Sequence, residues 1–107
     1  MLIYYTITQE AAVCKLPSLF RIGGYVVFFW SNENNEPIHV HVGRGKPSPG
    51  ATKIWITSKG GCIIANNNGN ISENELLKLL DIIAAQHFII CHEWRKHFNV
   101  DTIKYFC

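Results

Sequence analysis

The feature that most constrains the fold is a series of short apolar runs separated by turn residues across the first two thirds of the chain. Two of these runs follow glycine pairs, at Gly23-Gly24 and Gly60-Gly61, as the second strands of β-hairpins do. Others alternate apolar and polar residues with the period of two that strands show. The sequence therefore predicts strands at residues 20–22, 25–30, 38–42, 52–57 and 62–65.

A single long helix is expected after the last strand. Ser72 and Glu75 have the spacing of a capping box, and no Gly or Pro follows them, so the helix can continue to about Phe98, roughly 39 Å at 1.5 Å per residue. The apolar positions 76, 80, 83, 90 and 94 mark its buried face. The predicted fold class is α+β, an antiparallel sheet of 4–6 strands with one long C-terminal helix packed on one face.

Composition limits the class of protein. Apolar residues make up 48% of the 107 residues and charged residues 17%, as in globular domains. The four cysteines form no Cys-x-x-Cys pair, and the first residues lack the basic start of an export signal. The most apolar stretch, residues 76–91, is interrupted by charges and is too short for a membrane span. These features predict a cytoplasmic protein with free thiols and no membrane association.

The net charge of +2 does not identify a partner, but the charges are unevenly placed. Residues 37–72 contain four cations and no acid, which predicts a mildly basic surface in the middle of the chain. Arg44, Lys46 and Lys53 are its candidate binding residues, and Lys59 is the fourth cation.

His39 and His41 are the candidate catalytic and binding residues. Two residues apart on a strand, they project to the same side, with Cβ atoms roughly 6–7 Å apart. We expect them on an accessible face, with Val40 and Val42 buried on the other. A structural pair of imidazoles, an acid/base pair and two ligands of one metal all fit this spacing.

A metal site needs at least a third ligand. His87 and Cys91 lie one helical turn apart and could contribute, and Glu36 is the acid considered near the histidines. The Glu that follows His-x-His in cupins is absent here, because Gly43 stands in that region. In the three-His pattern of nucleotide hydrolases, Pro37 stands where the first His would be. From these residues we expect no bound metal and no other cofactor.

A metal-free ribonuclease is a further option. One of His39 and His41 would act as general base and the other as general acid, while cations hold the phosphate. Trp30 and Trp55 could stack on bases, although aromatic residues in strands this apolar are more often part of the core. Trp94 is expected to anchor the helix.

Several segments, taken together and in order, resemble a bacterial family known as domain of unknown function 4160. The resemblance covers about residues 16–98 and is most specific where Phe28-Phe29-Trp30, the His39-Val40-His41 motif and Trp94 occur in this order. It implies that residues 1–15 are an N-terminal extension and residues 16–107 a single domain. The segments are residues 16–25, 28–33, 37–42, 53–56, 65–69 and 94–98.

The resemblance also implies a function. Members often stand beside a second small protein in a two-gene unit similar to a toxin–antitoxin module, and some are described as transcriptional regulators. We therefore expect a small intracellular binding or regulatory protein that contacts a small partner protein, RNA or DNA through the face of His39 and His41. The alternative is an enzyme, either metal-free and RNase-like or a metal-dependent hydrolase, that uses the same two residues. Homo-oligomerisation is left open.

Overall fold

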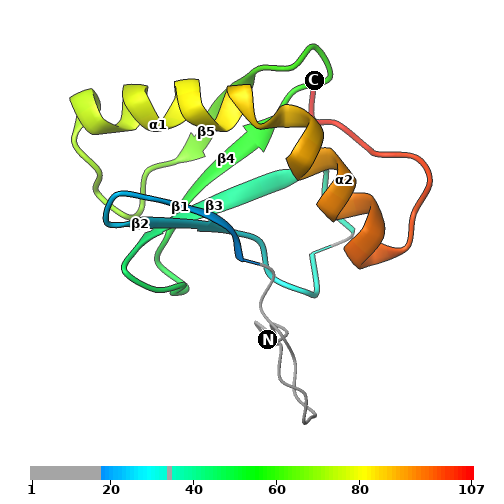
Figure 1. Ribbon diagram of the computed structural model, residues 1–107, viewed down its shortest axis with the longest axis horizontal. Helices are drawn as coiled ribbons and strands as arrows, with labels where there is room; N and C mark the ends of the chain where they lie inside the picture. Colours follow the sequence, from blue (N-terminus) through cyan, green and yellow to red (C-terminus); the bar gives the residue numbers. More distant parts are fainter. Residues whose placement is uncertain (1–17, 34) are drawn as a thin grey trace, which may run out of the picture.

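The computed structural model describes residues 18–33 and 35–107. The predicted extension at residues 1–15 lies outside this part of the chain. Five antiparallel strands form one sheet in the order β1-β2-β3-β4-β5, so every strand pairs with its neighbour in sequence (Figure 1). This confirms the predicted antiparallel sheet. The strands are β1 (Ser18–Ile22), β2 (Tyr25–Phe28), β3 (His39–Arg44), β4 (Thr52–Ile56) and β5 (Cys62–Asn66).

The glycine pairs lie in the predicted hairpin turns. Gly23, between β1 and β2, has a φ of 55°, and Gly60, between β4 and β5, has a φ of 90°. Positive φ values are adopted by glycine without a steric penalty, so these residues allow the chain to reverse tightly. The two hairpins place β2 and β4 on either side of the central strand β3.

The prediction of one long helix is wrong, because two helices are present. They are α1 (Glu73–Ala85) and α2 (His87–Phe98), separated at Gln86, where φ is −101° and ψ is 21°. An unbroken helix of this length would be as long as the 39 Å longest dimension of the molecule. The break turns α2 so that Ile90 and Trp94 are buried (Figure 1).

Of the two hydrogen bonds that a capping box would place at the start of α1, one forms. Ser72 Oγ accepts a hydrogen bond from the Glu75 backbone N–H at 3.4 Å. The Glu75 carboxylate accepts a hydrogen bond from the hydroxyl of Tyr25, on β2. Glu75 therefore links α1 to the sheet.

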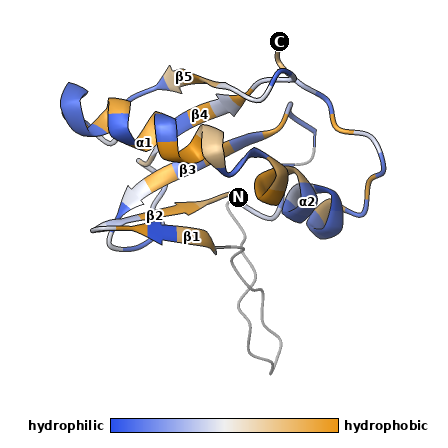
Figure 2. Ribbon diagram, turned by 45° about the horizontal axis from the view of Figure 1, so that its top comes forward, coloured by the Kyte–Doolittle hydropathy of each residue, from blue (hydrophilic) through white to orange (hydrophobic). Residues whose placement is uncertain are grey.

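Helix α1 lies over one face of the sheet, α2 runs past the ends of the strands, and residues of both helices belong to the main core (Figure 1). Apolar and polar residues alternate along α1, as expected for an amphipathic helix with one buried side (Figure 2). No helix in the described ranges is both long and apolar enough to span a membrane. The core includes Val27, Phe29, Ile38, Val40, Val42, Ile54, Ile56, Leu76, Leu79, Ile83, Ile90 and Trp94.

The opposite face of the sheet has a second, smaller apolar cluster made of Val26, Phe28, Trp30 and Ala51. The C-terminal tail contributes at the edge of this face. The Ile38 N–H donates to the Lys104 carbonyl at 2.8 Å, and the Phe106 ring stacks on Trp55 with centroids 4.9 Å apart. The C-terminal tail therefore covers part of the second face.

Candidate metal centre

The two histidines lie side by side on the second face of the sheet, at alternate positions of the central strand β3. The strand pattern predicted that they project to the same side, and their ring centroids are 5.0 Å apart. The prediction that this face is accessible is wrong, because the exposed fraction is 0% for His39 and 9% for His41. Val40 and Val42 are buried on the helix side, as expected. Both faces of β3 are thus buried.

Aromatic side chains surround the two imidazoles. His41 stacks on Phe28 with a centroid separation of 5.4 Å, and His39 lies 5.7 Å from the ring of Trp55 and 5.5 Å from that of Trp94. These rings remove water from the histidines, and polar groups in such surroundings need a partner close by. The apolar walls explain the burial that the alternation of residues could not indicate.

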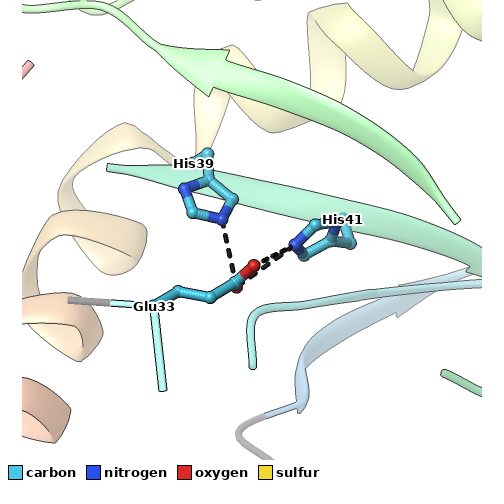
Figure 3. Close-up of side chains that lie close together, drawn as sticks. All are labelled: Glu33, His39 and His41. Carbon is cyan, nitrogen blue, oxygen red and sulfur yellow. Dashed lines mark hydrogen bonds and ion pairs between the residues drawn. The ribbon is translucent and has the colours of Figure 1, made fainter. Parts of the chain in front are cut away.

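The partner of both histidines is Glu33, in the loop between β2 and β3 (Figure 3). Glu33 Oε1 lies 3.0 Å from His39 Nε2, and Glu33 Oε2 lies 2.9 Å from His41 Nε2. The Glu33 side chain is 10% exposed, and its Oε1 also accepts a hydrogen bond from the Trp30 backbone N–H at 2.8 Å. The loop therefore folds back over β3 and brings a carboxylate to the imidazole pair.

The protonation of His39 follows from its other nitrogen. Nδ1 lies 2.8 Å from the Pro37 carbonyl oxygen, which can only accept, so Nδ1 carries the proton. Neutral His39 then presents the lone pair of Nε2 to the Glu33 carboxylate. Although the two atoms are 3.0 Å apart, Nε2 makes no well-aligned hydrogen bond. Two electron-rich atoms this close require a positive charge, either a proton on Nε2 or a cation bound by both.

The donor set fits a first-row divalent metal ion. The ligand atoms of Glu33, His39 and His41 all lie within 4.8 Å of one another, and theirs is the group of this kind found among residues 18–33 and 35–107. Two imidazoles and one carboxylate are a ligand set of catalytic zinc sites, which keep a further position open. A backbone carbonyl that fixes the distal N–H of a ligating histidine, as Pro37 does for His39, is typical of such sites.

Comparison with known protein families gives one result that bears on identity. A family model described as a domain of unknown function, DUF4160, matches residues 24–95. The chain belongs to the DUF4160 family. The match confirms the resemblance seen in the sequence and includes Glu33, His39 and His41. Neither the curated proteins nor the solved structures give a match.

The charge on Glu33 in this DUF4160 protein is set by opposing effects. Burial alone would raise the pKa of the carboxyl group. Where His39 and His41 present protons to Glu33, they outweigh this effect through hydrogen bonding and charge and lower the pKa to about 2. Glu33 is therefore a carboxylate at neutral pH, the form that can bind a metal or an imidazolium.

The predicted cationic residues lie at different distances from this centre in the DUF4160 fold. Lys53, on β4, pairs with His41 across the β3–β4 ladder, on the same face. Arg44 points to the opposite face by strand alternation and donates to the carbonyl oxygens of Gly69 and Asn70. Lys46 lies exposed in the loop after β3. The structure thus brings Lys53 close to the histidines, but not Arg44 or Lys46.

The ligands considered from the sequence lie elsewhere. Cys91 Sγ is 3.6 Å from His87 Nε2, within α2 and apart from the histidine pair. Glu36 accepts a hydrogen bond from Lys53 Nζ at 2.5 Å. Glu33, six residues before His39, was missed. Its position in a polar loop next to a His-x-His strand was the one signal available, because such a loop can fold back over the strand that follows it.

Proposed function

We propose that this protein binds one divalent transition-metal ion through Glu33, His39 and His41, and that it is a metal-dependent hydrolase. The observation that supports this proposal is the convergence of three ligand atoms within 4.8 Å, with Nε2 of both His39 and His41 directed at the Glu33 carboxylate. A metal ion would satisfy both groups at once. The expectation of no metal remains untested, and the proposal replaces it because that expectation did not include Glu33.

Within residues 18–33 and 35–107 the cluster has three ligands, and this number favours a catalytic over a structural role. Structural zinc sites have four protein ligands, whereas catalytic sites have three and hold water at the fourth position. A metal at this site would lower the pKa of that water and make it a nucleophile near neutral pH. The aromatic walls formed by Phe28 and Trp55 would strengthen the electrostatic effect by excluding bulk water.

Metal content and metal-dependent stability test the proposal. Elemental analysis of the protein purified without chelator is expected to give about one transition metal per chain. Added Zn²⁺ at a hundred times its Kd should stabilise the fold by about 2.7 kcal/mol. Glu33→Gln and the double variant His39→Ala, His41→Ala should lose both effects.

Two matched variants serve as controls for this experiment. Exposed His92, on α2, and Glu36, in the same loop as Glu33, are of the same residue types but lie outside the cluster. His92→Ala and Glu36→Gln should bind metal as the parent does. The proposal fails if the parent binds no Zn²⁺, Co²⁺, Mn²⁺, Fe²⁺ or Ni²⁺, or if the cluster variants bind as well as the controls.

A second candidate function is the protein-binding role that the family resemblance implies. Two adjacent apolar residues at the start of α2 favour it, since Phe88 is 83% exposed and Ile89 is 52% exposed. Apolar side chains this exposed are found at contacts with other proteins. Co-purification from the native host, with Phe88→Glu as the comparison, tests this role. A stoichiometric small protein that is lost with the variant supports it, whereas recovery of RNA or DNA instead would favour a nucleic-acid partner.

A further inference from the structure

Lys53 is a neighbour of the candidate metal centre but is not one of its three ligands. It pairs with His41 in the register of β3 and β4, so the two side chains project from the same face as cross-strand neighbours. The ammonium group lies 4.4 Å from the centroid of the Trp55 ring. The Lys53 side chain is 20% exposed. It is therefore a partly exposed positive charge on the same face of the sheet as the metal centre.

The partner of Lys53 is more exposed to solvent than Lys53 itself. Glu36 accepts from Lys53 Nζ at 2.5 Å, but its side chain is 42% exposed. A carboxylate that reaches water this easily gains little from the ion pair, since exposed pairs contribute roughly 0–1 kcal/mol. An anion that also binds a metal could displace Glu36 from Lys53 at small cost.

The charges around the centre indicate which anion fits. A divalent metal with the Glu33 carboxylate leaves one positive charge, and Lys53 adds a second once Glu36 has turned to solvent. A dianion neutralises both. A phosphate group also has several terminal oxygens, so one can coordinate the metal while another accepts a hydrogen bond from Lys53. A carboxylate has only one negative charge, so it would leave one of the two positive charges without a counter-charge.

We propose that the centre formed by Glu33, His39 and His41 binds the dianionic phosphoryl group of a phosphate monoester, with Lys53 as the second contact to that group. The inference rests on the proposed metal-dependent function and names its substrate class. In this arrangement the metal polarises the bound phosphoryl group and Lys53 neutralises its second charge.

Cobalt-loaded protein provides the test, because the visible spectrum of Co²⁺ reports both metal binding and changes in its ligands. The probe is inorganic phosphate, with acetate as the comparison anion. Phosphate should perturb the spectrum of the parent at much lower concentration than acetate. Lys53→Met should weaken phosphate binding about tenfold to a hundredfold, the loss of one charge-assisted hydrogen bond, while cobalt still binds.

Two further variants keep the result interpretable. Lys59→Met, in the exposed turn before β5, removes a cation of the same type and should bind phosphate as the parent does. Glu36→Gln removes the competing carboxylate and should tighten phosphate binding severalfold even if Lys53→Met does not fold.

The outcomes separate the two proposals. If cobalt does not bind, the metal-dependent function and the phosphoryl site both fail. If cobalt binds but phosphate leaves its spectrum unchanged, only the phosphoryl site fails. It also fails if acetate binds as tightly as phosphate, if Lys53→Met binds phosphate like the parent, or if Glu36→Gln does not strengthen binding.

Discussion

In the metal-free protein, replacing both histidines with alanine should cost much of the stability of the domain. The double variant His39→Ala, His41→Ala leaves the Glu33 carboxylate largely buried after its two imidazole partners are removed. Removing the partners of a buried charge costs about 3–5 kcal/mol. Domains of this size have a total stability of roughly 5–15 kcal/mol, so the loss is a large fraction of it. The melting temperature should fall by at least about 12 °C.

Urea unfolding with a chelator present measures this loss, and a third substitution tests its cause. Glu33→Gln removes the charge but retains the oxygen that accepts from the Trp30 N–H. It should destabilise the parent, yet restore at least about 1 kcal/mol in the double variant, because the unpaired charge is gone. His92→Ala should stay within about 0.5 kcal/mol of the parent. The reasoning is refuted if the double variant is as stable as His92→Ala. It is also refuted if Glu33→Gln changes the free energy of unfolding by the same amount in the parent and in the double variant.

Three other predictions follow from single features. Gly43→Ala should lower stability by about 1–3 kcal/mol in urea unfolding, because a Cβ there would lie 2.9 Å from the Lys46 carbonyl oxygen, and an unchanged midpoint would contradict this. Metal-free protein should lose stability as the pH falls from about 4.5 towards 2, because the pKa of Glu33 is about 2 in the folded protein and 4.5 in the unfolded chain. In acid titration, the free energy of unfolding of Glu33→Gln should change less over this pH range than that of the parent. Burial raises the pKa of Cys62 to about 11, so at pH 8 peptide mapping should find it alkylated more slowly than exposed Cys107, and equal rates would disprove its protection.

Much of the sheet was predictable because its signals are local. Strand alternation predicted the five strands, and the turns at Gly23 and Gly60 predicted the two hairpins. The pairing of β3 with β2 and β4 was not predicted. The helix break was not predictable from local pattern, since Gln86 is a good helix former and no Gly or Pro is nearby. After the break, Trp94 packs against Phe29 with rings 5.0 Å apart, a long-range contact that local sequence does not reveal.

In the candidate site, too, local sequence patterns predicted some features, whereas features set by long-range contacts were not predicted. Alternation along β3 correctly placed His39 and His41 on one side, because the period of a strand is a local property. It could not indicate their burial, which comes from a loop and from aromatic residues of β2, β4 and α2. Nor did it identify Glu33, since a polar loop has no periodicity that shows which side chain returns to the strand.

The three candidate ligands are close together in sequence as well as in space, because His41 is only eight residues after Glu33. Closing so short a segment costs little chain entropy even when the rest of the protein is unfolded. The denatured chain would therefore retain part of its affinity for the metal, and any affinity of that state subtracts from the stabilisation of the fold. If the protein binds a metal ion, a refolding chain could capture it as soon as β2 and β3 begin to pair, before the helices and the C-terminal tail are in place.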